Sequence, residues 1–261
     1  MKKLNQFITE YIVKKKLNKP INSEDQYKYF PKTKEELIEN IEELISKDIY
    51  DFNCIDTSAI TDMSNLFREL NKIKYTIDIS KWNVSNVTNM NYMFYGYKNF
   101  DCDLSDWDVS NVVSMISIFF NCENFKGKGL ENWDVSKVTS MRYMFYACKN
   151  FNCDLSNWNV SNVKHMKGTF YGCKKFKGKG LENWNVSNVE IMNYMFQYCT
   201  NFNGDLSNWN VSNVKRMMCM FEDCKNFNCD LSNWDVSNVI TIGWMFKGCT
   251  SLKNKPSWYE E

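Results

Sequence analysis

The sequence has only one histidine, His165, and no C-x-x-C pair among its 261 residues. Zinc sites need several closely spaced Cys or His ligands, and a nucleophilic cysteine or serine needs a neighbouring base, which is usually a histidine. A lone histidine satisfies neither requirement, and we interpret His165 as a surface residue. We therefore predict no metal ion, no other cofactor and no enzymatic activity.

A strong charge imbalance and a long hydrophobic run are also missing. The 32 basic and 31 acidic residues leave a formal net charge of +1, which gives no general attraction for nucleic acid. No run approaches the roughly 18 apolar residues of a membrane-spanning helix. We expect a protein partner, no nucleic acid and no membrane span, and the sequence indicates no oligomeric state.

The first residues, MKKLNQFITEYIVKKK, lack an uninterrupted apolar segment. Asn5, Gln6, Thr9 and Glu10 break up the hydrophobic stretch that a signal peptide requires. We expect a cytoplasmic location. A cell-surface location or secretion by a non-classical route is the alternative.

Tryptophan, in contrast, recurs at a fixed period. Successive separations are 25, 26, 25, 26, 25 and 25 residues for Trp82, Trp107, Trp133, Trp158, Trp184, Trp209 and Trp234. Such a period marks a repeat protein, in which one small unit stacks on copies of itself. We call each unit a rung and number its positions from the tryptophan, so that Val84 is at position 2. A degenerate rung precedes them, with Ile55 in the tryptophan place.

Apolar residues occupy the same positions in every rung. In the rung of Trp158 they are Leu155, Val160, Val163, Met166, Phe170, Cys173 and Phe176. The order Leu-x-x-Trp-x-Val has the alternation of a leucine-rich-repeat strand, and the later spacings of three and four indicate a bend and a short helical turn. We therefore predict an α/β repeat solenoid: about eight right-handed, leucine-rich-repeat-like rungs with a parallel sheet, short helical turns and a helical N-terminal cap.

The pattern divides the chain into three regions. We predict a helical N-terminal cap at residues 1–50, the solenoid at residues 51–253 and a C-terminal cap at residues 254–261. Thr33 and Glu36 form a capping box ahead of an apolar helical stripe. The stripe consists of Leu37, Ile38, Ile41, Leu44 and Ile45, and a shorter one upstream consists of Phe7, Ile8, Tyr11 and Ile12.

The eleven cysteines are an odd number, which favours reduced thiols. Six of them share position 15: Cys122, Cys148, Cys173, Cys199, Cys224 and Cys249. A cysteine that lies between apolar positions is typically buried as a small hydrophobic residue. We predict a ladder of free cysteines in the core, with disulfides between neighbouring rungs as the alternative.

The tripeptide Gly-Lys-Gly occurs twice, at Gly127–Gly129 and Gly178–Gly180. A phosphate-binding loop would need a following Gly-Lys-Ser/Thr and a helix, and both are missing. We predict turns that accommodate the extra residue of the 26-residue rungs.

The rung Leu-Ser-Asn-Trp-Asn-Val-Ser-Asn-Val, continued by Met, Met-Phe and Cys, resembles the BspA-like leucine-rich-repeat proteins. It looks most like the branch first noted in mycoplasma lipoproteins as a repeat domain of unknown function. The resemblance covers residues 51–253. It implies a surface-antigen or adhesin role with host-protein binding, and it supplies no catalytic residues.

Positions 6, 7, 9 and 10 differ from rung to rung, so the repeat architecture leaves them free. They carry residue types that dominate protein interfaces. We predict partner-binding residues at Tyr92, Arg142, Tyr143, Lys164, Lys167, Tyr194, Lys215, Arg216 and Trp244. The predicted function is a non-enzymatic scaffold that binds a macromolecule, most readily a protein. The alternatives are an exported adhesin or immune-evasion protein and a structural subunit of a larger assembly.

Overall fold

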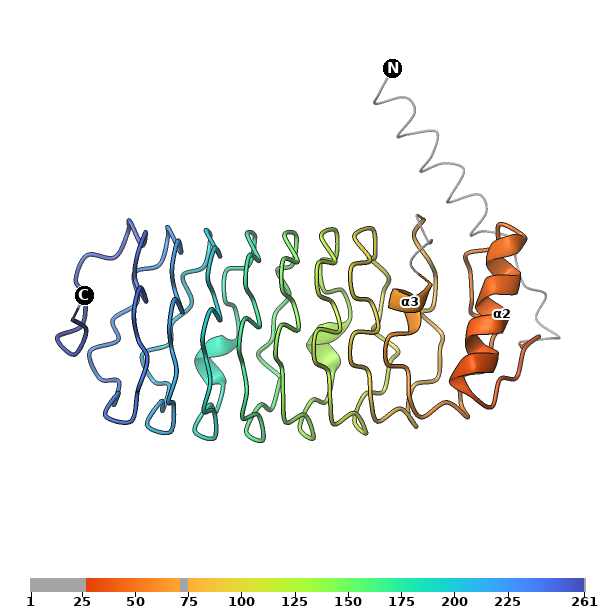
Figure 1. Cartoon of the computed structure of the whole chain (residues 1–261), viewed down its shortest axis with the longest axis horizontal. Coiled ribbons are helices and arrows are strands. Elements are labelled where there is room, and N and C mark those ends of the chain that lie inside the picture. Colours follow the sequence, from red (N-terminus) through yellow and green to blue (C-terminus); the bar gives the residue numbers. More distant parts are fainter. Residues whose placement is uncertain (1–26, 71–74, 261) are drawn as a thin grey trace, which may run out of the picture.

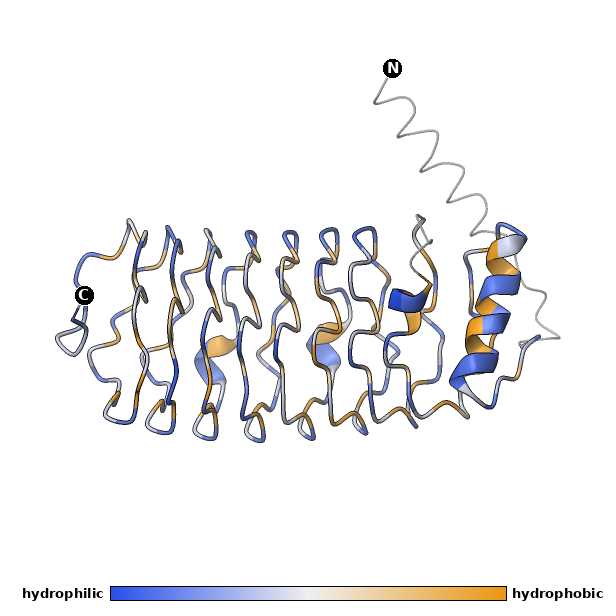
Figure 2. Cartoon of the chain, in the orientation of Figure 1, coloured by the Kyte–Doolittle hydropathy of each residue, from blue (hydrophilic) through white to orange (hydrophobic). Residues whose placement is uncertain are grey.

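The computed structural model describes residues 27–70 and 75–260 as a row of stacked rungs. The rungs follow one another along the long axis of the molecule, with the helix α2 (Lys34–Ser46) at one end and the C-terminus at the other (Figure 1). Hydrophobic segments recur at similar places in successive rungs (Figure 2). The tryptophan period therefore corresponds to one turn of the stack.

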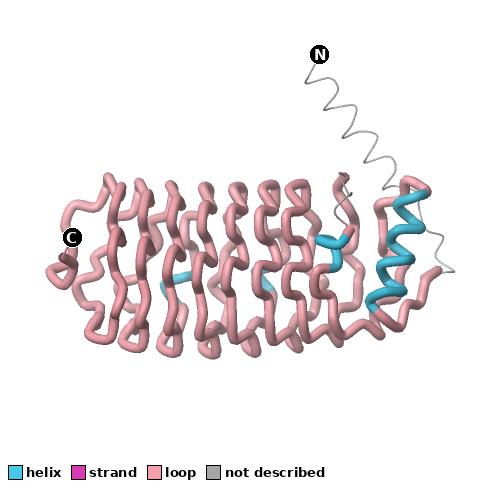
Figure 3. The backbone as a smooth tube through the Cα atoms, viewed as in Figure 1, coloured by secondary structure: helices cyan, strands magenta, loops and turns pink. Residues whose placement is uncertain are grey.

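The predicted α/β fold with a parallel sheet is wrong. The described part of the chain contains no strand, and its only regular elements are α2, the four-residue helix α3 (Leu66–Glu69) and the 3-10 turns η1 (Leu130–Asn132) and η2 (Leu181–Asn183) (Figure 3). Neighbouring rungs are joined by isolated parallel bridges at position 7, such as those of His165 with Ser140 and Ile191. The stack is therefore built from turns and not from leucine-rich-repeat strands.

Consecutive turns within each rung explain the absence of strands. From Trp184 to Phe202, six backbone N–H groups donate to the carbonyl three residues earlier. They are Trp184 to Leu181 (3.1 Å), Val189 to Val186 (2.9 Å), Met195 to Met192 (3.2 Å), Gln197 to Tyr194 (3.3 Å), Cys199 to Phe196 (2.9 Å) and Phe202 to Cys199 (3.0 Å). A residue inside such a turn is not extended, so Leu-x-x-Trp-x-Val cannot form a strand here.

Alternate backbone N–H groups from position 8 to position 14 make hydrogen bonds to the next rung. The groups at positions 8, 10, 12 and 14 donate to carbonyls at positions 7, 9, 11 and 13 of the next rung. Between the rungs of Trp184 and Trp209 these bonds are Met192 to Arg216 (2.8 Å), Tyr194 to Met218 (2.9 Å), Phe196 to Met220 (2.9 Å) and Tyr198 to Glu222 (2.8 Å). Positions 10 and 14 are left-handed in every rung from Trp82 onward. This alternation directs all four N–H groups of a rung toward its C-terminal neighbour.

The predicted inward positions are correct. The seven repeat tryptophans are buried, and neighbouring indoles in the middle of the stack are nearly parallel, as for Trp158 and Trp184 with centroids 6.3 Å apart. Each indole Nε1 donates to the carbonyl at position −3 of the preceding rung; the Trp158 bond to Leu130 is 2.7 Å long. The position-12 phenylalanines form a second stack, with Phe145 and Phe170 5.6 Å apart. The burial pattern is thus independent of strand formation.

Helix α2 begins where the capping box predicts. The Thr33 hydroxyl accepts a hydrogen bond from the Glu36 N–H (3.2 Å), and the helix buries Leu37, Ile41 and Leu44. The Lys34 ammonium donates to the Ser64 carbonyl at 3.2 Å, which ties the helix to the Ile55 rung. The second predicted helix, near Phe7 to Ile12, lies outside the described residues.

The register extends one rung further at each end than the seven tryptophans. Ile55 is fully buried, and the Trp82 indole donates to the Phe52 carbonyl at position −3 of the Ile55 rung (2.9 Å). At the other end Trp258 occupies a further tryptophan place, with its centroid 6.3 Å from that of Trp234. Sequence comparison missed Trp258 because its rung is shorter. The Gly-Lys-Gly segments are turns, as predicted, and lead into η1 and η2.

Candidate functional site

Four of the predicted binding residues lie at position 10, where the backbone is left-handed. The φ angles are 59° at Tyr92, 55° at Tyr143, 61° at Tyr194 and 59° at Trp244. A side chain in this region costs about 1 to 2 kcal/mol, and Gly168 occupies the same position with φ 59°. Backbone geometry therefore favours glycine at position 10, and the aromatic rings are present against that preference.

A lysine lies between two of these tyrosines. The Lys167 Nζ is 5.6 Å from the ring centroid of Tyr143 and 5.7 Å from that of Tyr194, and the Arg142 Cζ is 6.0 Å from the Tyr143 centroid. Gly168 makes room for this arrangement, because a Cβ there would be 2.6 Å from a carbon of the Tyr143 ring. We call Arg142, Tyr143, Lys167 and Tyr194 the aromatic-cation cluster.

Three other predicted cations occupy different columns. Lys164 and Lys215 are exposed at position 6, where Lys215 forms an ion pair with Glu190 at 2.8 Å. Arg216 is exposed at position 7, in the row of parallel bridges. These side chains lie along the stack between the turn that closes at position 5 and the cluster positions.

The last two predicted residues lie near the ends of the repeats. The Tyr92 ring centroid is 5.5 Å from the Arg68 guanidinium, which belongs to the Ile55 rung. Trp244 is in the rung of Trp234 and is 64% exposed. The structure thus brings together the four cluster residues and distributes the others over the length of the stack.

An aromatic ladder at position 13 was missed by the sequence analysis. Four half-buried rings stack face to face, with successive centroids 4.4, 4.4 and 4.2 Å apart: Tyr95, Phe120, Tyr146 and Tyr171. The Tyr143 ring meets Tyr146 edge-on at 5.8 Å, so the ladder adjoins the aromatic-cation cluster. Its signal was present in the sequence, because comparison of position 13 between rungs shows four consecutive aromatics.

Stacking within the ladder occupies the faces of its rings. Each inner ring has both faces against its neighbours, and the face of Tyr171 meets Tyr198 edge-on at 5.3 Å. Burial, followed by the hydrogen bond with Tyr146, raises the pKa of the Tyr171 hydroxyl. The hydroxyl therefore stays protonated at neutral pH. A ligand ring therefore cannot stack between the rings of the ladder, but it can contact their edges.

The comparison with known protein families agrees with the repeat register. The family model described as "Mycoplasma protein of unknown function, DUF285" matches residues 33–152, 107–180 and 166–260. The chain belongs to this family. The overlapping matches reflect the repeats of a DUF285 protein, and they confirm the predicted resemblance to a mycoplasma repeat domain of unknown function. No curated protein and no solved structure matches the chain.

The cysteines of this DUF285 protein are free thiols, and the column at position 15 forms a ladder. Each of its thiols lies close to the position-12 carbonyl of the preceding rung; the Cys148 Sγ is 2.9 Å from the Phe119 oxygen. Burial raises the pKa of the Cys148 thiol. Thiolate formation in the folded protein is therefore disfavoured at this column.

We expect a thiol reagent at mildly alkaline pH to distinguish the buried column from the half-buried cysteines. After denaturation, eleven thiols per chain should react, because all the cysteines are free. In the folded protein, Cys153, Cys229 and the last residue of the column, Cys249, should react first, since all three are only partly buried. Rapid native reaction of Cys148 or Cys173, located by mass spectrometry, would contradict the ladder.

Residues 27–70 and 75–260 contain no group of three or more His, Cys, Asp or Glu side chains suited to hold a metal ion. His165 is half-buried, and its Nδ1 has no hydrogen-bond partner within the described part of the chain. The described segments also contain no helix of sufficient length and hydrophobicity to cross a membrane.

Proposed function

We propose that this DUF285 protein is a non-enzymatic scaffold that binds a protein partner through the aromatic-cation cluster and the adjoining aromatic ladder. The observation that carries the proposal is the placement of Lys167 between the Tyr143 and Tyr194 rings, both at left-handed positions. Strained residues persist where another requirement outweighs their cost, and such sites are concentrated in binding surfaces. Gly168 shows that the same backbone accepts glycine.

The chemistry of this surface suits a polypeptide with acidic side chains. Arg142 is exposed and Lys167 is half-buried, so both cations adjoin solvent beside large aromatic rings. Tyr and Arg supply much of the binding energy in protein interfaces, because they combine apolar area with hydrogen-bond donors. Tyrosine hydroxyls add further donors along the ladder. A partner that offers carboxylates or carbonyl oxygens would complement this surface.

We expect the double variant Tyr143→Gly, Tyr194→Gly to lose capture of its partner without losing stability. Glycine relieves the left-handed strain, so the unfolding midpoint should stay equal or rise. Affinity capture from a lysate, followed by mass spectrometry, would identify partners that bind the original protein and not the variant.

The matched control is Ser117→Gly, Cys219→Gly, which makes the same backbone change at position 10 without removing a ring. This control should capture the same partner as the original protein. Undiminished capture by the double tyrosine variant would show that the surface is not the binding site.

A role as an exported adhesin is the second candidate, favoured by the resemblance of the rung to BspA-like proteins. It would use the same surface for a host protein. Capture from host-cell extract, but not from a lysate of the source cells, would favour this candidate over an internal scaffold.

A further inference from the structure

The C-terminal end of the stack exposes a row of backbone donors. In the rung of Trp234, positions 8, 10, 12 and 14 are Ile242, Trp244, Phe246 and Gly248. In the preceding rung the equivalent N–H groups donate to Thr241, Gly243, Met245 and Lys247 at 2.8, 3.0, 3.0 and 2.7 Å. None of the four terminal N–H groups meets an acceptor among residues 27–70 and 75–260. Between positions 7 and 14 the end of the stack offers only donors, because the carbonyls at positions 7, 9, 11 and 13 already accept from the preceding rung.

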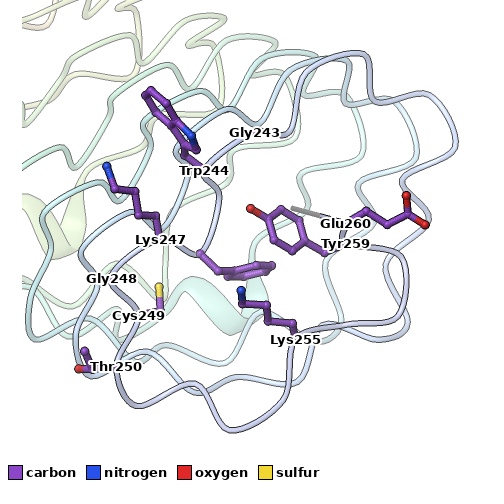
Figure 4. A pocket seen from close by; sticks show the side chains of 10 residues that line it. Gly243, Trp244, Lys247, Gly248, Cys249, Thr250, Lys255, Tyr259 and Glu260 are labelled. Carbon is purple, nitrogen blue, oxygen red and sulfur yellow. The ribbon is translucent and has the colours of Figure 1, made fainter.

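The final residues cover the core at this end and leave the donor row beside a hollow. Trp258 stacks on Trp234, and the Tyr259 ring meets Phe246 edge-on at 5.0 Å. The hollow has a volume of about 680 Å³ and is lined by Gly243, Trp244, Phe246, Lys247, Gly248, Cys249, Thr250, Lys255, Tyr259 and Glu260. Figure 4 shows Trp244 and Lys247 on one side, Tyr259 on the other and Glu260 pointing away. Space for a chain segment therefore adjoins the donors.

The charges around the hollow favour an electron-rich occupant. Lys247 is exposed and forms an ion pair with Glu222 of the preceding rung at 3.2 Å. Both residues are at position 13, so an acid at this position of one rung lies within reach of the lysine at the same position of the next rung. An acidic residue at position 13 of an added segment would lie next to Lys247 on the opposite side. Lys255 adds a second positive charge to the lining. Together with the N–H row, these groups select carbonyl oxygens and carboxylates.

A second copy of the chain is a poor occupant. Two C-terminal ends placed together would oppose donors to donors. A head-to-tail copy would have to use the carbonyls at the opposite end, where Lys34 of α2 already donates to Ser64. A polypeptide segment with a free row of carbonyls would complement these donors better than either arrangement.

We propose that the C-terminal end of the stack binds a segment of a partner polypeptide, which adds a further rung by aligning four alternate carbonyls with the N–H row and placing an acidic side chain beside Lys247. Backbone pairing supplies the affinity, as in the addition of a strand to a sheet edge. The exposed Trp244 covers one side of the segment. This surface is separate from the aromatic-cation cluster and uses different atoms.

The chain itself supplies a suitable probe. In the middle of the stack, the rung of Trp158 donates the equivalent four hydrogen bonds to carbonyls of the Trp184 rung. The acceptors are Ile191, Asn193, Met195 and Gln197, at 2.8, 2.9, 2.9 and 2.8 Å. A synthetic peptide of residues 190–198 with Gln197→Glu therefore carries the acceptor row and an acid at position 13. The matched peptide has Gln197→Lys instead.

Amide hydrogen exchange followed by NMR tests the proposal. In the free protein, the amides of Ile242, Trp244, Phe246 and Gly248 should exchange much faster than the equivalent amides of the Trp184 rung. The Gln197→Glu peptide at millimolar concentration should slow exchange at all four amides. The Gln197→Lys peptide should bind at least about threefold more weakly, because its lysine and Lys247 carry the same charge. Absence of protection, or equal protection by inorganic phosphate, would overturn the proposal.

Two variants assign the effect to the hollow. Trp244→Gly should weaken binding of the Glu peptide severalfold while preserving the fold, since φ at this position is 59°. Ser117→Gly makes the same backbone change far from the hollow and should leave binding unchanged. The proposal would also be contradicted if the Trp244→Gly variant and the original protein bound the peptide equally well. Dimerisation that protects the same four amides at high protein concentration would contradict it as well. Failure here would leave the cluster test unaffected, because that test uses neither Trp244 nor the terminal amides.

Discussion

Replacing Trp158 with alanine is expected to lower the free energy of unfolding by about 3 to 5 kcal/mol. Trp158 is only 3% exposed, and its ring stacks against Trp184. The change also removes the indole donor to the Leu130 carbonyl, which lies in a region without water access. Because every rung depends on its neighbours, a cavity here weakens two rung interfaces at once. Denaturant unfolding followed by circular dichroism would measure the loss.

Trp258→Ala is the matched control for that experiment. Trp258 makes the equivalent hydrogen bond to Leu231 (2.9 Å), but it is half-buried and has a rung on one side only. Its replacement should therefore cost clearly less than that of Trp158. Similar losses for the two variants would argue against a core that is continuous along the stack.

Gly129→Ala is expected to cost about 3 kcal/mol or more, because backbone strain and overpacking add. Gly129 has a φ of 93°, and a Cβ there would lie 2.2 Å from the Ser105 backbone nitrogen and 2.5 Å from the Leu104 carbonyl carbon. Both neighbours are backbone atoms, which cannot rotate away as a side chain can. The clash would separate the rungs of Trp107 and Trp133. Thermal unfolding of the purified variant would report the loss.

Gly96→Ala separates the strain from the clash. Gly96 has a φ of 79°, but a Cβ there would meet no atom within 4 Å. Its replacement should cost only about 1 to 2 kcal/mol. If both glycine variants lost the same stability, close approach of the rungs at Gly129 would not be the reason for its glycine.

Part of the proposed binding surface could be predicted from positions 9 and 10. Comparison between rungs identified Tyr143, Tyr194 and the nearby Arg142 and Lys167, because residues that the core does not require vary from rung to rung. It did not indicate that Lys167 lies between the two rings, since that depends on how neighbouring rungs are aligned. The ladder from Tyr95 to Tyr171 was overlooked although its residues recur at one position. Its stacking distances, however, are set by rung spacing.

The strand prediction failed for a physical reason that concerns many repeat proteins. Trp158 and Val160 are buried with the exposed Asn159 between them, as they would be in an extended strand. The backbone instead closes a turn, with the Trp158 N–H donating to the Leu155 carbonyl at 3.1 Å. Hydrophobic spacing reports which side chains point inward, and both conformations satisfy it.

The sequence by itself determined the rung length, the register, the buried columns and the capping helix α2. These features depend on the spacing of apolar residues and on local hydrogen bonds, which are written along the chain. Only the tertiary structure decided the backbone conformation between the buried residues, the ring ladder and the open donor row beyond Trp244. Their hydrogen-bond and stacking partners lie about one rung away, so these features exist only when the rungs are stacked.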